Sequence, residues 1–231
     1  MITIDFEDPL EYSKKSPIHM AIYGYNGVGK TTFAGSTSMR TVFLDCGDSG
    51  AVTLRGAGKN IKIVRIKSIK HYLEVVEELN RKPGEIELLV PDTITGLQSM
   101  AIKEVKGRLN DMNQRKWGLV GSKVIECLTE TRNFPRDVIY LIQERKKTAD
   151  DEPDTIMPGL TPSMRGALSS LVDWVGHMDI DDEGRRTIDF RITKDMEVKD
   201  RANIFPKLLV NASYTAIRKR IVEKIHNPKG E

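Results

Sequence analysis

The sequence predicts an α/β fold in which a mostly parallel central sheet is flanked by helices and continues into an antiparallel extension near the C-terminus. Three observations lead to this class. Short apolar runs alternate with helix-like segments as far as residue 142, which is the pattern of parallel strands joined by helical crossovers. The later apolar runs follow one another through tight turns, which is typical of antiparallel strands. A glycine-rich turn lies directly between the first run and the first helix-like segment.

The predicted parallel strands are runs rich in Val, Ile and Leu, and they cover residues 18–23, 41–45, 61–66, 86–92 and 137–142. The spacing of apolar residues predicts helices from residue 32, over 71–81, over 96–108 and, after a polar break, over 120–133. Pro91 lies in one of the strands. Because proline has no N–H to donate to a ladder, we expect the ladder to end at that residue.

A polar segment, 144–161, follows the last of these strands and is acidic at 150–154. Its position after a core strand predicts a mobile functional loop. Beyond it the sequence predicts a helix over 163–171, strands over 172–178, 186–193 and 196–199, and a basic amphipathic helix over 214–225. The chain is therefore divided into a lead-in (residues 1–16), a core domain (residues 17–210) and a basic C-terminal helix or tail (residues 211–231).

The composition is typical of a soluble folded domain, since 39% of the 231 residues are hydrophobic and 30% are charged. No run of 18 apolar residues exists, so no membrane span is expected. The first residues lack the layout of a signal peptide, and the expected compartment is the cytoplasm of the cell that makes the protein, which would be a host cell if the protein is phage-encoded. Two cysteines, Cys46 and Cys127, exclude a zinc motif or a disulfide framework and are expected to be buried.

The glycine-rich turn Gly24-Tyr25-Asn26-Gly27-Val28-Gly29-Lys30-Thr31 fits G-x-x-x-x-G-K-[ST], the phosphate-binding loop called Walker A. Backbone N–H groups of such a loop point inward at a phosphate. We expect Lys30 to reach the β- and γ-phosphates of ATP, and the Thr31 hydroxyl to ligate Mg²⁺. The predicted nucleotide-binding residues are Tyr25, Asn26, Gly27, Val28, Gly29, Lys30, Thr31 and Thr32.

Mg²⁺ chemistry also needs an acid at the tip of a neighbouring strand. Asp92 follows the apolar run 88–91 and is the predicted metal-binding partner of Thr31, with Thr93 in a supporting role. The alternative is that Asp92 caps the helix that follows it.

Hydrolysis needs a group that orients or deprotonates a water molecule beside the γ-phosphate. Asp45 and Asp48 follow the second predicted strand and are the candidates for this role. Gln143, at the end of the strand 137–142, is expected to sense the γ-phosphate and to transmit its state to the polar segment. For all three residues, a solvent-facing position at a strand end is the alternative.

Together these segments resemble the RecA-like P-loop ATPase core, and in particular the small phage-encoded ATPases of that class that accompany single-strand annealing and recombination. The resemblance covers roughly residues 17–210 and rests on segments in the expected order, which are 24–32, 41–45, 90–95, 142–145 and 198–201. It implies a Mg²⁺-dependent ATPase that assembles on single-stranded DNA, as a ring or a filament, during phage recombination or replication.

The resemblance gives Lys199-Asp200-Arg201 a role as the Lys-x-Arg finger that acts on a neighbouring subunit's nucleotide. A positive charge supplied in this way stabilises the transferring phosphoryl group. In a strand, Lys199 and Arg201 point to the same side, as the role needs. The alternative is a solvated basic strand edge.

One residue departs from the pattern of these ATPases. They place a catalytic glutamate shortly after the second strand, where this chain has Gly47. Either Asp48 replaces that glutamate or hydrolysis is slow.

The expectation of DNA binding combines the resemblance with the charge distribution. Residues 102–147 contain eleven Lys or Arg and six Asp or Glu, and Arg145-Lys146-Lys147 leads into the polar segment. Trp117 is the candidate for base stacking, and the C-terminal helix is a second basic surface. The acidic residues at 150–154 count against a simple phosphate cradle.

Two other functions remain open at this point. A small-molecule P-loop kinase is one alternative, although no compact arginine-rich lid follows Gln143. The other is an ATP-gated annealing or mediator protein that binds nucleotide and hydrolyses little of it, which the glycine at position 47 favours.

Overall fold

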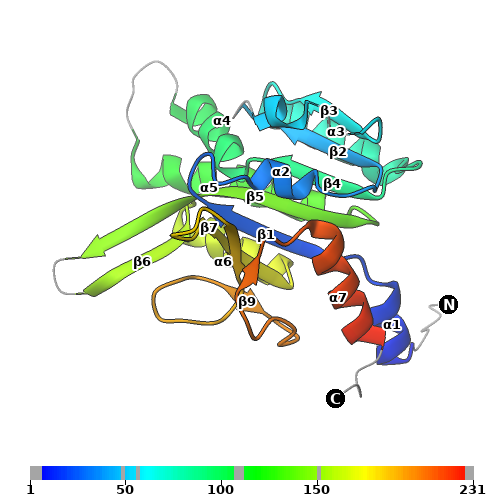
Figure 1. The fold of residues 1–231 in the computed structure, drawn as a ribbon. Helices are drawn as coiled ribbons and strands as arrows, with labels where there is room; N and C mark the ends of the chain where they lie inside the picture. Colours follow the sequence, from blue (N-terminus) through cyan, green and yellow to red (C-terminus); the bar gives the residue numbers. More distant parts are fainter. Residues whose placement is uncertain (1–6, 48–49, 56–57, 107–111, 150–151, 227–231) are drawn as a thin grey trace.

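In the computed structural model, the structure describes residues 7–47, 50–55, 58–106, 112–149 and 152–226. They form a sheet in the order β10-β8-β7-β1-β5-β4-β2-β3, with β6 paired to β5 and β9 paired to β7 (Figure 1). The strands are β1 (His19–Gly24), β2 (Thr41–Asp45), β3 (Ile61–Arg65), β4 (Leu88–Asp92), β5 (Asp137–Ala149), β6 (Glu152–Pro158), β7 (Trp174–Ile180), β8 (Arg186–Asp189), β9 (Lys199–Asp200) and β10 (Leu209–Val210). Pairings among β1 to β5 and between β1 and β7 are parallel, whereas β6, β8, β9 and β10 pair antiparallel. The predicted fold class is confirmed.

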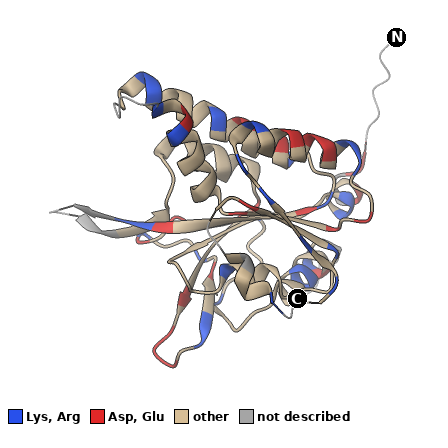
Figure 2. Ribbon diagram, turned by 90° about the horizontal axis from the view of Figure 1, so that it is seen from above, with Lys and Arg blue, Asp and Glu red and all other residues tan. Residues whose placement is uncertain are grey.

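The helices lie on both faces of the sheet (Figures 1 and 2). They are α1 (Pro9–Lys15), α2 (Lys30–Ala34), the 3₁₀ turn η1 (Gly50–Leu54), α3 (Ile69–Arg81), α4 (Ile94–Lys106), α5 (Gln114–Arg132), α6 (Pro162–Leu171) and α7 (Tyr214–His226). α5 begins six residues before the predicted start at 120, because the Asn113 side chain accepts a hydrogen bond from the Lys116 N–H and caps the helix. None of the described helices is long and apolar enough to cross a membrane.

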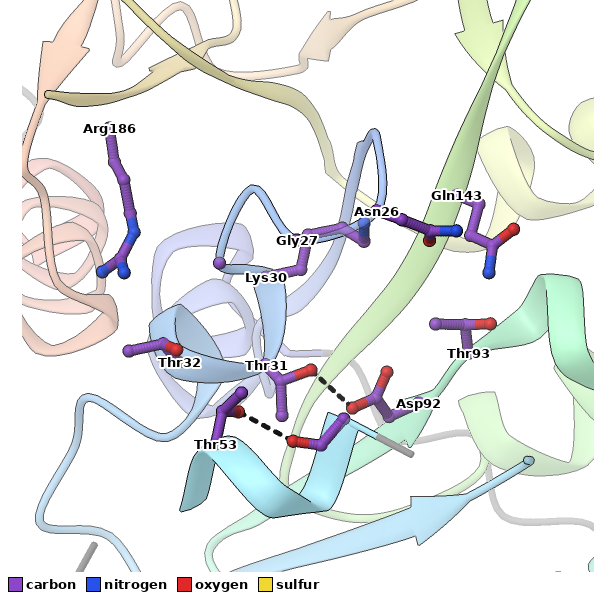
Figure 3. A pocket seen from close by; sticks show the side chains of 12 residues that line it. Asn26, Gly27, Lys30, Thr31, Thr32, Thr53, Asp92, Thr93, Gln143 and Arg186 are labelled. Atoms are coloured by element: carbon purple, nitrogen blue, oxygen red, sulfur yellow. Dashed lines mark hydrogen bonds between the residues drawn. The ribbon is translucent and has the colours of Figure 1, made fainter. Parts of the chain in front are cut away.

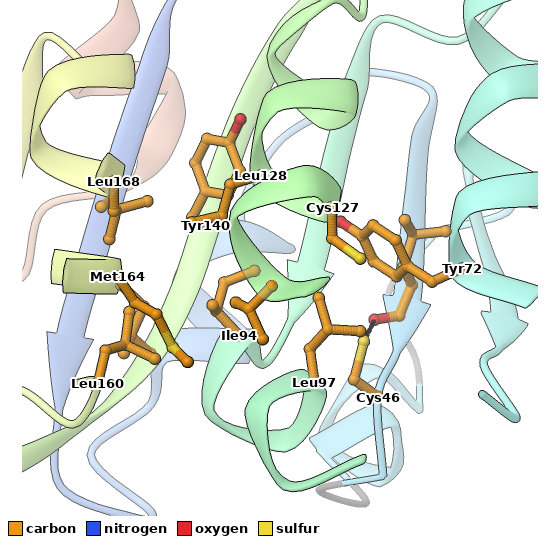
Figure 4. Packing of buried hydrophobic residues seen from close by; sticks show 14 of the residues in the cluster. Cys46, Tyr72, Ile94, Leu97, Cys127, Leu128, Tyr140, Leu160, Met164 and Leu168 are labelled. Atoms are coloured by element: carbon orange, nitrogen blue, oxygen red, sulfur yellow. Dashed lines mark hydrogen bonds between the residues drawn. The ribbon is translucent and has the colours of Figure 1, made fainter. Parts of the chain in front are cut away.

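Alternate residues of the central strands point to two hydrophobic clusters, one on each face of the sheet. In β5, Tyr140 belongs to the cluster that packs under α3, α4, α5 and α6, whereas Ile139 and Leu141 belong to the cluster under α2 and α7. Figure 4 shows the first cluster around Tyr140, with Cys46 and Cys127 inside it. Both cysteines are free and buried, as expected. This burial of apolar side chains on both faces explains why the strands read as continuous apolar runs.

The polar segment after Gln143 forms a hairpin, and the prediction of a loop is wrong. β5 continues to Ala149 and pairs antiparallel with β6, so that the two strands extend away from the body of the molecule (Figure 1). Ile156 in β6 packs against the first cluster, and its carbonyl accepts a 3.3 Å hydrogen bond from the Tyr23 hydroxyl. These contacts with distant residues anchor the base of the hairpin. The polar sequence of the segment itself does not predict them.

Two further strand predictions are corrected. β4 continues through Pro91 to Asp92, which pairs with Asp45 of β2. Pro91 pairs with a residue of β2. The pairs between β4 and β5 involve Leu88, Leu89 and Asp92, so this second ladder skips Pro91, and the proline is tolerated. The predicted strand 196–199 reduces to β9, which contains only Lys199–Asp200.

The basic helix α7 packs onto the core. Tyr214, Ile217 and Ile221 are buried in the second cluster. The Tyr214 hydroxyl and the Arg218 Nε donate to Asp137 Oδ2 over 3.0 and 2.7 Å, and burial raises the pKa of Tyr214. Arg218 is therefore bound to the start of β5.

Candidate nucleotide-binding site

The glycine-rich turn joins the carboxyl end of β1 to α2. Gly27 and Gly29 have φ angles of 85° and 107°, a region that residues with a β-carbon rarely adopt. Val28 is fully buried in the second cluster, which holds the turn against the core. The turn therefore presents Asn26, Gly27 and Gly29 to the cavity above α2 (Figure 3).

This cavity has a volume of about 460 Å³ and is formed by five parts of the chain. Its described lining residues are Asn26, Gly27, Gly29, Lys30, Thr31, Thr32, Gly50, Thr53, Asp92, Thr93, Gln143 and Arg186. Of the eight predicted nucleotide-binding residues, six line the cavity. Val28 is in the core, and the Tyr25 side chain is exposed while its carbonyl contacts Lys30.

Lys30 lies under the turn and is only 7% exposed. Its Nζ donates to the carbonyls of Gly24 and Tyr25 over 2.8 and 2.9 Å. The ammonium is thereby held at the wall of the cavity, inside the arc of the turn, where a phosphate chain would meet it.

Thr31 and Asp92 meet at the floor of the cavity. The Thr31 hydroxyl donates to Asp92 Oδ2 over 2.8 Å, which places two hard oxygen atoms side by side (Figure 3). Such oxygens are the ligands that Mg²⁺ prefers, together with phosphate oxygens and water. No group of three His, Cys, Asp or Glu among the described residues could hold a metal by itself, so an ion here would take its other ligands from the nucleotide and water. The donor set fits Mg²⁺ in this form.

Thr93, and not Asp92, caps the start of α4. The Thr93 Oγ1 accepts a 3.0 Å hydrogen bond from the Gly96 N–H, which is the geometry of a helix cap. Asp92 is 6% exposed and faces Thr31.

The strand that ends in Asp92, β4, is not the direct neighbour of β1 that was expected, because β5 lies between them. The strand order thus places Gln143 between the phosphate-binding turn and Asp92.

Gln143 lies where the cavity meets the hairpin. It pairs with Gly24 across β1 and β5, and its N–H donates to Thr95 Oγ1 over 2.9 Å. Its carbonyl accepts a 2.7 Å hydrogen bond from Gly159, just after β6. This position agrees with a residue that connects the nucleotide to the hairpin, a role that stays a prediction.

The predicted water-activating acids are not brought into the cavity by the described part of the chain. Asp45 Oδ1 accepts a 2.9 Å hydrogen bond from the Gly47 N–H, and Asp45 is not among the described lining residues. Asp48 lies outside the described residues. Asp92 is therefore the one carboxylate among the described residues that line the cavity.

Lys199 and Arg201 lie away from the cavity of their own chain. Lys199 Nζ donates to the carbonyls of Ser169 and Val172 over 2.5 and 2.7 Å, and Arg201 forms a 2.6 Å ion pair with Asp173. Burial, and next the charge of Arg201, lower the pKa of Lys199. The argument that both side chains share a strand face is wrong, because β9 ends at Asp200 and Arg201 lies in a turn.

Sequence reasoning missed three lining residues, Gly50, Thr53 and Arg186. Gly50 and Thr53 belong to η1, and Arg186 begins β8. None of them belongs to a motif, and Arg186 is more than 150 positions from the glycine-rich turn. The antiparallel pairing of β7 with β8 and the parallel pairing of β7 with β1 bring it there.

The fold and this site define a P-loop NTPase core: a mostly parallel sheet with a glycine-rich turn after β1, a lysine inside the turn, and a threonine–aspartate pair at its end. The family model described as the AAA domain matches residues 16–202, and the chain belongs to this family. Its P-loop NTPase type suggests nucleotide-dependent ATPase activity. A comparison with curated protein sequences gave no match.

Proposed function

We propose that this chain binds ATP with Mg²⁺, hydrolyses it, and assembles on single-stranded DNA in phage recombination or replication. The observation that carries the nucleotide part is the 2.8 Å contact between Thr31 and Asp92 beside the Lys30 ammonium, in a cavity formed by the phosphate-binding turn. This set offers one cation for the phosphates and two oxygens for a metal ion.

The chain's own groups have distinct tasks in this proposal. Lys30 and the N–H groups of the turn would bind the phosphate oxygens. Thr31 and Asp92 would hold Mg²⁺, Thr31 directly and Asp92 through water, and the bound ion would supply positive charge near the β- and γ-phosphates. Gln143 contacts the γ-phosphate, and Asp48 orients the attacking water. Lys199 and Arg201 act on the nucleotide of an adjacent subunit.

Substitution of Asp92 tests the metal site. Asp92→Asn keeps the shape of the side chain and removes its charge, so we expect turnover to fall about 100-fold because the ion is held less well. ATP hydrolysis is measured over a range of Mg²⁺ concentrations and after chelation with EDTA. A matched control is Asp45→Asn, whose carboxylate lies outside the cavity lining. Equal, Mg²⁺-independent turnover in wild type and Asp92→Asn would contradict the proposed site.

A second candidate function is an ATP-gated annealing or mediator protein with little hydrolysis. It is favoured by the absence of any carboxylate other than Asp92 from the described lining, together with Gly47. Such a protein would bind ATP tightly with a turnover near the background rate. Detectable turnover that Lys30→Ala abolishes would dismiss this candidate.

The hairpin supports the DNA part of the proposal. Arg145 and Lys146 are exposed on β5, just beyond Gln143, on an arm that extends from the body (Figure 2). Trp117 on α5 is 41% exposed, so its ring is accessible for stacking. Lysine and arginine on such an arm can contact the phosphates of a single strand of DNA without recognising its base sequence.

The DNA part is tested by two measurements. ATP hydrolysis is measured with and without single-stranded DNA, and the affinity for single-stranded DNA is measured separately. We expect the double variant Arg145→Glu/Lys146→Glu to weaken DNA binding by roughly tenfold or more and to reduce its salt dependence, because two phosphate contacts are lost. Lys62→Glu/Lys70→Glu is a control with the same charge change on β3 and α3, outside the basic stretch 102–147. Turnover that DNA does not stimulate, and affinity that the hairpin variant does not alter, would remove DNA from the proposed function.

A further inference from the structure

The arginine at the start of β8 lies directly against the phosphate-binding turn. A β-carbon added to Gly29 would be 2.5 Å from Nε and 2.9 Å from Cζ of Arg186. These distances are shorter than contacts between real β-carbons and their neighbours, so the guanidinium occupies the space that Gly29 leaves open. Glycine at this position is required by its φ of 107°, and the flexible Arg186 side chain lies in the space that the missing β-carbon leaves.

The charge of Arg186 is not neutralised by any described residue. Its side chain is exposed and forms no ion pair or hydrogen bond within the part of the chain that the structure describes. The two neighbouring arginines differ, since Arg185 pairs with Asp181 and Glu183, and Arg191 pairs with Asp189. Arg186 thus presents an uncompensated guanidinium to the cavity.

The backbone that carries Arg186 is held on both sides. On one side Arg186 pairs with Ile180 of β7. On the other side its N–H donates to Asn211 Oδ1 over 3.2 Å, and its carbonyl accepts a 2.7 Å hydrogen bond from the Asn211 N–H. The side chain therefore starts from a fixed point above the turn.

The position of Arg186 indicates which part of a nucleotide it meets. In Figure 3 it lies on the side of Thr32, across the cavity from Gln143, with Lys30 between them. Thr31 and Asp92 define the metal side, where the β- and γ-phosphates lie. The rest of the nucleotide must then leave the cavity away from Gln143, over Thr32. The first charged group on that path is the α-phosphate.

We infer that Arg186 binds the phosphate chain in cis, on the α-phosphate side, and positions the nucleotide for the metal site. This inference rests on the proposed nucleotide binding. A guanidinium gives paired donors to phosphate oxygens, which a lysine cannot match in geometry. Because the α-phosphate is present in ATP, in ADP and throughout hydrolysis, the contact contributes to binding and not selectively to the transition state.

The inference is tested with Arg186→Ala and the neighbouring control Arg185→Ala, which removes the same charge one residue away. Binding of ATP and of ADP is measured by calorimetry with Mg²⁺ present, and turnover is measured over a range of ATP concentrations. We expect Arg186→Ala to weaken ATP and ADP binding alike by about tenfold, with the loss of kcat/KM appearing in KM. Arg186→Lys should recover only part of the affinity, and Arg185→Ala should bind both nucleotides like the wild type.

Several results would overturn the inference. Unchanged affinity of Arg186→Ala for both nucleotides would exclude the contact. A loss confined to kcat would assign Arg186 to the transition state, and an equal loss in Arg185→Ala would indicate a general effect of charge. Competition with inorganic tripolyphosphate separates phosphate from base contacts, because Arg186→Ala should weaken tripolyphosphate binding as well. If the wild type binds no nucleotide, the proposed function itself fails, and this outcome is distinct from the others.

Discussion

Lys30 and Lys199 make the same type of contact in two different regions of the molecule. Each donates its ammonium to two backbone carbonyls, Lys30 to Gly24 and Tyr25, and Lys199 to Ser169 and Val172. The carbonyls around Lys30 belong to a turn that opens into a cavity. Those around Lys199 belong to the C-terminal end of α6 and the residue after it.

The surroundings of the two lysines decide what each bond does. Next to Lys30 lie Thr31, Asp92 and the open space of the cavity, so its ammonium can pair with an anionic ligand there. Lys199 satisfies carbonyls that a helix end leaves without partners, and it contributes to the stability of α6. Hydrogen bonding alone therefore does not distinguish the two lysines, whereas the adjacent oxygen pair and the cavity show which of them faces a ligand site within its own chain.

The largest effect is expected from Lys30→Ala. We expect kcat/KM for ATP to fall about 1000-fold, because the cation that stabilises charge on the phosphates is removed. The free energy of unfolding should change by no more than about 1 kcal/mol, since the desolvation cost of the buried ammonium disappears together with its hydrogen bonds. Turnover assays and denaturant unfolding measure the two quantities. If Lys30→Ala is strongly destabilised and still active, Lys30 stabilises the fold and does not act on the nucleotide.

Arg201→Ala tests whether the region around Lys199 also acts on nucleotide, in a neighbouring subunit. If it does, turnover should fall about 100-fold while the affinity for ATP is kept, because the charge acts only on the transferring group. Turnover and ATP affinity are measured at protein concentrations where the chain assembles. Asp173→Asn is the control, since it breaks the same ion pair and leaves Arg201 in place. An equal loss in both variants, or a parallel loss of ATP binding, would count against the finger.

The smallest effect is expected from Lys199→Met, which keeps the length of the side chain and removes its donors. The free energy of unfolding should fall by about 1 kcal/mol, because the carbonyls of Ser169 and Val172 lose their partner. Binding of ATP to the isolated chain should not change. Lys194→Met, at an exposed position, is the control for loss of charge. If Lys199→Met unfolds like the wild type, Lys199 does not stabilise α6.

Most of the strands and helices were predictable because they depend on local patterns. Buried strands such as β1 and β4 are short apolar runs, and α3 repeats apolar residues at helical spacing. The β5–β6 hairpin was missed because its strand residues are mostly polar and its anchoring contacts are with Tyr23 and the first cluster. α1 was not predicted either, since it is a short helix that packs against α7 at the other end of the chain.

The phosphate-binding turn was readable from eight consecutive residues, because its chemistry depends on backbone conformation and on a lysine and a threonine adjacent in sequence. Asp92 was also located by its place after an apolar run, although its alternative role as a helix cap was excluded only by the hydrogen bond of Thr93. Tertiary structure decided that β5 lies between β1 and β4, that Lys199 caps α6, and that Arg186 reaches the turn. The physical reason is that strand order and side-chain approach depend on pairing between segments far apart in the chain, and no local pattern encodes such pairing.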